Sequence, residues 1–200
     1  MFDLVLGTGN AKKLHELQWV VPTDRIRVTS LSQIPGALDV DETGTTFFEN
    51  ARLKACEQAK HLSRWVLADD SGLEVDALGG QPGVYSARYA GTHGDDAGNN
   101  TKLLAELDGV PPEKRGAAFV CVLCLSDRDG NVVFEAEGRC RGRIGEAASG
   151  TAGFGYDPLF VIREYRKTFA ELDFAVKRAI SHRSIAMRKF ASWLEANPLV

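Results

Sequence analysis

The sequence has little net charge, few cysteines and no long apolar run, and each of these absences excludes a class of protein. Its formal net charge is only -3 over 200 residues, so no basic field along the chain attracts nucleic acid or an anionic membrane. No apolar run approaches the ~20 residues that a membrane-spanning helix needs, and the first residues do not resemble a signal peptide. We therefore expect a cytoplasmic protein that binds neither nucleic acid nor membranes.

The four cysteines do not form the disulfide framework of a small secreted protein, which favours a reducing compartment. Cys121 and Cys124 match a C-x-x-C spacing inside a strand-like run, where positions three apart face opposite sides. There is no second cysteine pair to complete a zinc site. With 44% hydrophobic and 26% charged residues, the composition is that of an ordinary globular protein. The length fits a single domain over residues 1–200, built as two lobes.

Strand-like and helical patterns alternate along the first part of the chain, which predicts an α/β architecture. Strand-like runs occupy residues 2–6, 26–29, 65–68 and 73–78. Apolar residues at three- and four-residue spacing predict a helix over 45–63, and further helices are expected over 95–107 and 181–197. Residues 115–145 read as two long strands joined at Asp129-Gly130, a hairpin signal.

The first strand runs into a glycine turn and a helical pattern, an arrangement whose free N–H groups suit phosphate. The spacing matches neither the dinucleotide fingerprint nor the P-loop. Thr8, Asn10 and Lys13 would supply polar and cationic contacts. The alternative is that Asn10 is merely the helix cap beside two solvated lysines.

Acidic residues flank the predicted 45–63 helix and the strand at 65–68. We expect that strand to end at Asp69-Asp70, at the edge where open α/β sheets bind ligands, with the two carboxylates facing opposite sides. One of them together with Glu42 would make an oxygen site suited to Mg²⁺, and the alternative is a carboxylate that caps a local turn. Lys54 could reach the same place or be solvated, whereas Glu49 has capping-box spacing from Thr46.

Two later segments add candidate ligand contacts. Phe154 and Tyr156 lie between glycines, where an aromatic ring could stack on a base or plug the edge of the core. His182 and Arg183 fall in the first turn of the closing helix, where a cation opposes the helix dipole unless an anion lies nearby. The alternative for the second segment is a basic, solvated surface.

Six ordered motifs together resemble the Ham1-like inosine triphosphate/xanthosine triphosphate pyrophosphatase family, over nearly the whole length. They are Thr8-Gly9-Asn10-x-x-Lys13, Glu42-Thr43-Gly44 with Phe47, Glu49-Asn50-Ala51 and Lys54-Ala55, Asp69-Asp70-Ser71-Gly72-Leu73, Pro82-Gly83-Val84-Tyr85-Ser86-Ala87-Arg88, Gly153-Phe154-Gly155-Tyr156-Asp157-Pro158 and Ser181-His182-Arg183.

The resemblance implies an elongated, mixed α/β sheet with flanking helices, in two lobes around a central nucleotide-binding cleft. It also implies a homodimer that uses Mg²⁺ to hydrolyse non-standard purine nucleoside triphosphates, namely ITP, dITP and XTP. The products would be the monophosphate and pyrophosphate, so that deaminated purines leave the nucleotide pool.

Matching positions carry the family's roles onto this sequence. Asp70 and Glu42 match the catalytic residues and metal ligands. The substrate contacts would be Thr8, Gly9, Asn10, Lys13, Lys54, Ser71, Phe154, Gly155, Tyr156, Asp157, Lys177, His182 and Arg183. The sequence departs from the family at Phe174-Ala175-Val176, where acidic residues are common.

Two other functions stay open from the sequence. One is a Maf-type nucleotide pyrophosphatase acting on pyrimidine or modified triphosphates, although the Phe154 loop and the Ser181-His182-Arg183 motif argue against it. The other is a nucleotide-binding sensor without catalysis. The pair of Glu42 and Asp70 argues against a sensor, because binding phosphate calls for cations more than for paired carboxylates.

Overall fold

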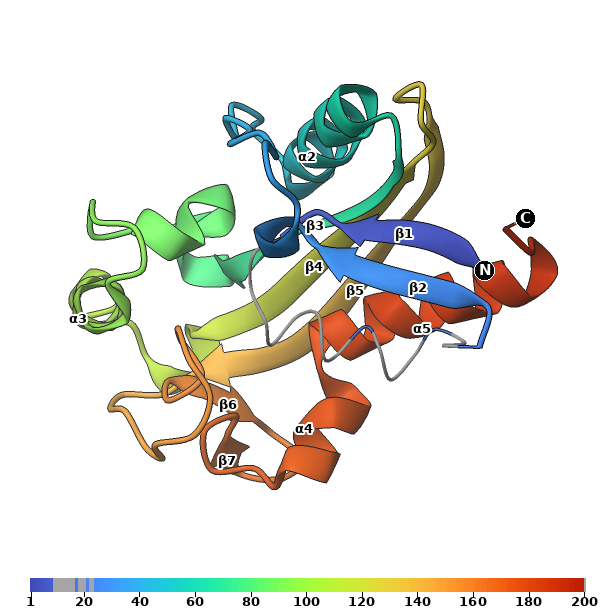
Figure 1. Cartoon of the computed structure of the whole chain (residues 1–200). Helices are drawn as coiled ribbons and strands as arrows, with labels where there is room; N and C mark the ends of the chain where they lie inside the picture. The colour runs from blue at the N-terminus through green and yellow to red at the C-terminus, as the bar shows by residue number, and fades with distance from the viewer. Residues whose placement is uncertain (9–16, 18–20, 22–23, 200) are drawn as a thin grey trace. The chain divides into compact units, whose positions relative to one another are not determined.

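The computed structural model describes residues 1–8, 17, 21 and 24–199, and within them the strands form one mixed sheet (Figure 1). Strand β1 is parallel to β2 and β3, whereas β6 is antiparallel to β5 and β7. The predicted α/β class with a mixed sheet and flanking helices is therefore confirmed. In the order β2-β1-β3-β4-β5-β6-β7, the strands are Ile26–Ser30, Phe2–Leu6, Trp65–Val75, Gly116–Ser126, Val132–Ile144, Phe160–Ile162 and Lys167–Thr168.

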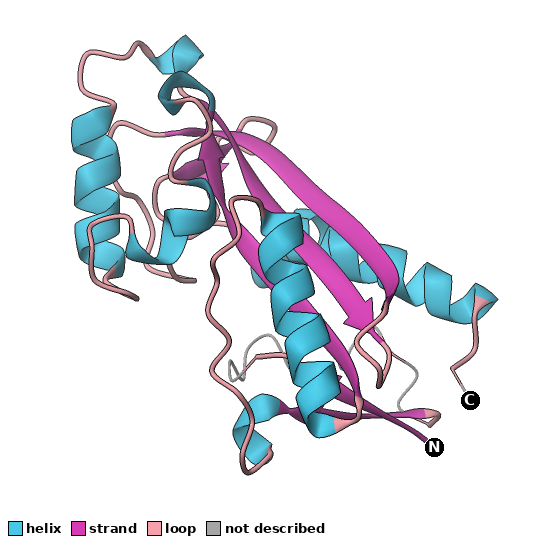
Figure 2. Cartoon of the chain, turned by 90° about the horizontal axis from the view of Figure 1, so that it is seen from above, coloured by secondary structure: helices cyan, strands magenta, loops and turns pink. Residues whose placement is uncertain are grey.

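Among the described residues, the α-helices are α2 (Phe47–Leu62), α3 (Asp96–Glu106), α4 (Phe174–Ile180) and α5 (His182–Ala196), drawn as cyan coils beside the magenta strands in Figure 2. The contacts divide the chain into two compact units. The first contains Met1–Asp70, Cys121–Gly138 and Arg183–Val200, and the second contains Ser71–Val120 and Arg139–His182. The single domain with a central cleft stays a prediction. No helix in the described part of the chain is long and apolar enough to cross a membrane.

In the first unit, apolar residues pack against both faces of β1, to which its successive side chains point in turn. Leu4 and Leu6 belong to an apolar cluster with Ala186 and Phe190 of α5, whereas Val5 packs with Ala59 of α2. Figure 1 shows α2 and α5 on opposite sides of this strand. Burial on both faces makes β1 a fixed support for the segment that follows it.

Helix α2 begins with the capping box that the sequence predicted. The Thr46 hydroxyl accepts a hydrogen bond from the Glu49 N–H at 3.2 Å, and the Glu49 carboxylate accepts one from the Thr46 N–H at 3.1 Å. Two N–H groups that lack a partner within the helix are thereby satisfied. The structural role expected for Glu49 is confirmed.

Replacing Thr46 by Ala should therefore lower the free energy of unfolding by about 1 kcal/mol, because the first turn loses its acceptor. Urea unfolding followed by circular dichroism would measure the change. Thr46→Ser keeps the hydroxyl and is the matched control. Equal unfolding free energies for the Ala and Ser variants would contradict this account of the cap.

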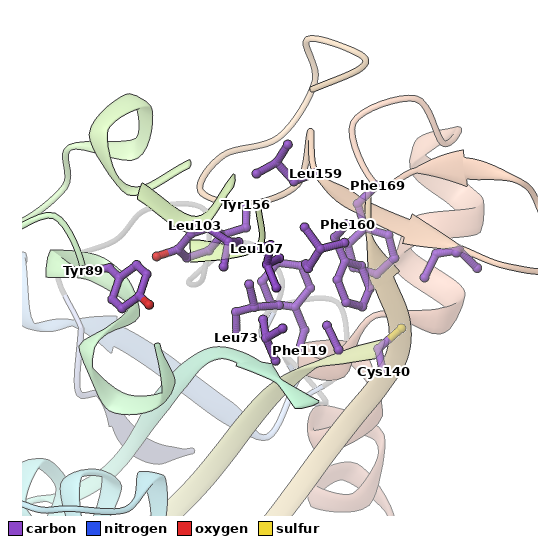
Figure 3. Packing of buried hydrophobic residues seen from close by; sticks show 14 of the residues in the cluster. Leu73, Tyr89, Leu103, Leu107, Phe119, Cys140, Tyr156, Leu159, Phe160 and Phe169 are labelled. Atoms are coloured by element: carbon purple, nitrogen blue, oxygen red, sulfur yellow. The ribbon is translucent and has the colours of Figure 1, made fainter. Parts of the chain in front are cut away.

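The second unit has its own aromatic core (Figure 3). The ring of Phe119 lies 4.5 Å from that of Phe160 and 5.7 Å from that of Phe169, centroid to centroid. All three side chains are buried. The loop that carries Phe154 leads directly into β6, which begins at Phe160, so this core fixes one end of the loop.

The strand that contains Asp69 and Asp70 is longer than predicted. Residues 65–68 and 73–78 were expected to be separate strands with a turn between them, but β3 is continuous from Trp65 to Val75. Ser71 and Gly72, which the sequence analysis expected in a turn, belong to this strand. The last pair of β3 with β1 joins Leu6 to Leu67, so β3 extends past its parallel neighbour. Asp69 and Asp70 thus lie within a strand, just beyond the end of β1.

The predicted hairpin is confirmed. Strands β4 and β5 are neighbours in the sheet, and residues 127–131 connect them. The Asp127 carboxylate accepts hydrogen bonds from the N–H groups of Asp129 and Asn131, at 3.0 and 2.8 Å.

Candidate active site

In the first unit, an ammonium group lies between two carboxylates from different segments. Lys54 Nζ on α2 donates hydrogen bonds to Glu42 Oε1 at 2.9 Å and to Asp70 Oδ1 at 3.0 Å. The side chains of Lys54 and Asp70 are only 16% and 10% exposed. The structure thus brings together the three charged residues that the sequence analysis placed near one another, and Lys54 is not a solvated lysine.

Asn50 is a residue of this cluster that the sequence analysis quoted in a motif but did not single out as a site residue. Its exposed fraction is 0%. Its amide nitrogen donates to Asp70 Oδ2 at 3.3 Å, and its Oδ1 accepts from the Gly44 N–H at 2.8 Å. Asn50 therefore links the loop of Glu42 to the strand of Asp70. The signal that could have found it is its place three residues after Phe47, on the buried face of the helix.

The close approach at Gly44 also explains the glycine there. A Cβ built on this residue would lie 2.6 Å from Asn50 Oδ1 and 2.7 Å from Glu49 Cβ. Any side chain would push the loop away from α2 and break the bond to Asn50.

Burial sets the electrostatics of the cluster. It raises the pKa of Asp70, and the like charge of Glu42 adds to that rise, against the opposing effects of Lys54 and Asn50. Burial alone would lower the pKa of Lys54, but the carboxylates of Asp70, Asp69 and Glu42 outweigh it, and its pKa is raised. Lys54 therefore stays charged at neutral pH.

The raised pKa of Asp70 has a consequence for stability. A carboxyl whose pKa is higher in the folded chain binds its proton more tightly there, so its contribution is greatest below the unfolded pKa and falls as pH rises through the folded value. Keeping Asp70 ionised at neutral pH thus opposes folding. Such a cost is typical of functional sites, and a bound cation would offset it.

The donor set suits a hard divalent cation. No group of three or more His, Cys, Asp or Glu side chains able to hold a metal occurs in the described ranges, which leaves the two carboxylates of Glu42 and Asp70. Mg²⁺ is usually held in this way, by one or two carboxylates together with substrate phosphates. The residues present therefore fit Mg²⁺ bound jointly with a nucleotide.

In the second unit, the glycine loop presents one aromatic ring and buries the other. Phe154 is 40% exposed. Tyr156 is 4% exposed and belongs to the aromatic core, and its hydroxyl donates to the Ser86 carbonyl at 2.8 Å. Tyr156 therefore plugs the edge of the core, whereas stacking of a ligand on the half-exposed ring of Phe154 stays a prediction.

Asp157 organises the same loop. Its Oδ2 accepts from the Phe154 N–H at 2.9 Å and pairs with Lys177 Nζ at 2.5 Å. A Cβ on Gly153, which has a φ of 86°, would lie 2.9 Å from Lys177 Nζ. The structure thus joins Asp157 and Lys177, two predicted site residues that are 20 positions apart.

His182 and Arg183 are buried rather than solvated, each 7% exposed, so the reading of a basic, solvated surface is wrong for them. The ring of His182 stacks on Phe119 of the second unit, with centroids 4.9 Å apart. Arg183 belongs to the first unit. The helix α5 begins at His182, as the sequence predicted for this segment.

Gly7 and Thr8, the described residues at the start of the predicted phosphate loop, are held by close contacts with neighbouring strands. Gly7 is packed so closely that a Cβ would lie 2.8 Å from that of Ala68. The carbonyl of Thr8 accepts a hydrogen bond from the Ser30 hydroxyl at 2.7 Å. Gly9, Asn10 and Lys13 lie outside the described residues. Ser71 follows Asp70 within β3.

Comparisons with known proteins agree on one family. A model described as the Ham1 family matches residues 4–193. A Rhodopirellula baltica protein named dITP/XTP pyrophosphatase is 67% identical over 95% of this chain and 91% of its own. One of the same name from Desulforamulus reducens is 49% identical over 93% of this chain and 92% of its own.

Solved structures give the same result for the fold. A HAM1 protein from Coxiella burnetii superposes with a TM-score of 0.91 at 37% identity, covering 98% of this chain and 100% of that one. The Staphylococcus aureus Ham1 protein superposes with a TM-score of 0.89 at 41% identity, covering 97% and 98%.

Proposed function

The chain belongs to the Ham1 family, and on that premise we propose that it hydrolyses dITP, ITP and XTP to the nucleoside monophosphate and pyrophosphate. The relatives named dITP/XTP pyrophosphatase cover nine-tenths of this chain or more. The observation that carries the proposal is the buried cluster of Glu42, Lys54 and Asp70. A site that only bound phosphate would have no use for two carboxylates, one of which, Asp70, is held buried at a cost in stability.

Each residue of the cluster has a distinct task in this reaction. Glu42 and Asp70 would hold Mg²⁺, which supplies charge neutralisation on the phosphate oxygens. Lys54 adds a fixed positive charge beside them, and Asn50 holds one Asp70 oxygen in place. The glycine turn at Thr8, with Gly9, Asn10 and Lys13, would contact the phosphates through its N–H groups and the lysine.

The chemical step is a hydrolysis at the α-phosphorus. Asp70 accepts a proton from a water molecule as the water oxygen bonds to the α-phosphorus. The bond from that phosphorus to the bridging oxygen breaks, and pyrophosphate leaves with the electron pair. Lys54 and Arg183 stabilise the negative charge that grows on the phosphate oxygens.

The base would be held by the segment of Phe154, Gly155, Tyr156 and Asp157, with Lys177, His182 and Ser71 as further contacts. A pocket that donates hydrogen bonds to a 6-oxo group leaves a donor facing a donor when adenine enters. A mismatch of this kind in a dry site lowers affinity strongly. The exposed ring of Phe154 is the stacking surface. The homodimer, which the family resemblance implies, and the cytoplasmic location, which the composition predicts, stay predictions.

The proposal is tested by pyrophosphate release from dITP, ITP, XTP, GTP, ATP and dTTP, each with Mg²⁺ and with excess EDTA. We expect rapid turnover of the first three and loss of at least about 100-fold on chelation, because charge neutralisation of the triphosphate is then missing. Magnesium added back in excess should restore the rate.

Other outcomes would identify the competing functions. Turnover confined to dTTP or another pyrimidine nucleotide would indicate a Maf-type activity. Tight nucleotide binding without pyrophosphate release would indicate a sensor.

A further inference from the structure

The N-terminal half of α3 holds both polar groups of one residue in the Phe154 loop. The Gly155 N–H donates to Asp96 Oδ2 at 2.7 Å, and Asn100 Nδ2 donates to the Gly155 carbonyl at 2.9 Å. Asp96 and Asn100 are four positions apart, so they lie on the same face of the helix. All three residues belong to the second unit.

The two hydrogen bonds from α3, together with one to Asp157, fix the peptide planes before, between and after Phe154 and Gly155. Asp157 binds the N–H of Phe154, Asp96 binds the next N–H, and Asn100 binds the carbonyl after it. The glycines at 153 and 155, with φ of 86° and 60°, allow this conformation but do not select it, because glycine populates many others equally well. The side chains of Asp96 and Asn100 on α3 select this one loop conformation.

The geometry points to Asp96 and Asn100 as positioning residues for base recognition: they hold the Phe154 loop in its base-stacking conformation before the nucleotide arrives. This inference rests on the proposed role of that loop. A preformed stacking surface improves affinity because the loop is already ordered, so binding does not have to overcome the entropy cost of ordering it. The two residues would therefore act on the affinity for the base and leave the chemistry at the α-phosphorus unchanged.

The Asn100 amide allows a test that separates hydrogen bonding from packing. Its Oδ1 is buried and accepts no hydrogen bond from the residues that the structure describes, so its known contribution is the bond from Nδ2. Asn100→Asp keeps the shape but replaces that donor with an oxygen facing the Gly155 carbonyl. Asn100→Ala removes the donor without adding repulsion.

We expect KM for dITP to rise roughly tenfold in Asn100→Asp and by less in Asn100→Ala, since a lost or reversed hydrogen bond acts in that range. The value of kcat should stay within about twofold. A role in packing alone predicts the opposite order, with the smaller Ala the more damaging. Inorganic triphosphate, which carries no base, should inhibit both variants with the wild-type inhibition constant.

Thr101→Val is the matched control, because Thr101 is an exposed residue of the same helix whose hydroxyl donates to the Ala97 carbonyl at 2.9 Å. An unchanged KM in Asn100→Asp would overturn the inference. So would an inhibition constant for triphosphate that rises in step with KM. Absence of dITP turnover in the wild type and in Thr101→Val alike would instead overturn the proposed function, and the inference with it.

Discussion

Asp70→Asn should reduce kcat/KM for dITP by about 10²- to 10⁴-fold, the range typical of losing a general base or metal ligand. The amide keeps the shape of the side chain, and its single oxygen can still accept from Lys54, but its NH2 group then faces the Asn50 amide donor. It cannot carry the negative charge that the metal needs, and it cannot accept the proton of the attacking water. The loss should appear mainly in kcat, measured as pyrophosphate release at saturating Mg²⁺.

Asp76→Asn provides the matched control for this loss. Asp76 is a half-exposed carboxylate paired with Arg141 at 2.6 Å, and surface pairs of this kind contribute little. Its variant should turn over dITP at the wild-type rate. Near-normal turnover in Asp70→Asn would refute the assignment, and Asp69→Asn would then be the next variant to measure.

Phe160→Ala should lower the free energy of unfolding by about 3 to 5 kcal/mol, as deletion of a buried aromatic ring does. The side chain is fully buried, and its ring packs against Phe119 and Phe169 with centroid distances of 4.5 and 5.0 Å. The neighbouring rings of Phe119 and Phe169 are held in the same buried cluster, so we expect the space left by the deleted ring to remain a cavity. Denaturant unfolding would measure the change.

The effect should also reach the base loop. The Phe160 N–H donates to the Tyr156 carbonyl at 3.0 Å, so the loop is bonded to the strand whose core contact is lost. Tyr165→Ala is the control, since that aromatic is 47% exposed and should change stability by less than about 0.5 kcal/mol. Similar losses in the two variants would show that the aromatic cluster does not carry the stability of this unit.

Local patterns were enough to predict several elements. The Thr46 and Glu49 spacing gave the start of α2, and the apolar stripe through Phe47, Ala51 and Ala55 gave its buried face. The Asp129-Gly130 turn gave the β4–β5 hairpin. These signals are readable because a cap, a helical period and a tight turn depend on residues within a few positions of one another.

The segment of Asp69 and Asp70 shows where prediction from local sequence fails. The Asp-Asp-Ser-Gly segment has the composition of a turn, yet it continues β3, whose neighbour in the sheet on the side away from β1 is β4. Tertiary pairing overrode the local preference. The functional role of Asp70 stays a prediction, and the strand passes the end of β1 just before that residue.

The sequence by itself determined the family, the mixed α/β class and the charged residues of the candidate site, because ordered motifs and short-range periodicity are properties of the chain. Only the tertiary structure decided that Asn50 is buried between Gly44 and Asp70 and that Asp96 and Asn100 hold the Phe154 loop. These contacts join residues from 6 to 59 positions apart. Helical spacing shows which face a side chain occupies, but the partner on that face is chosen by the packing of distant segments.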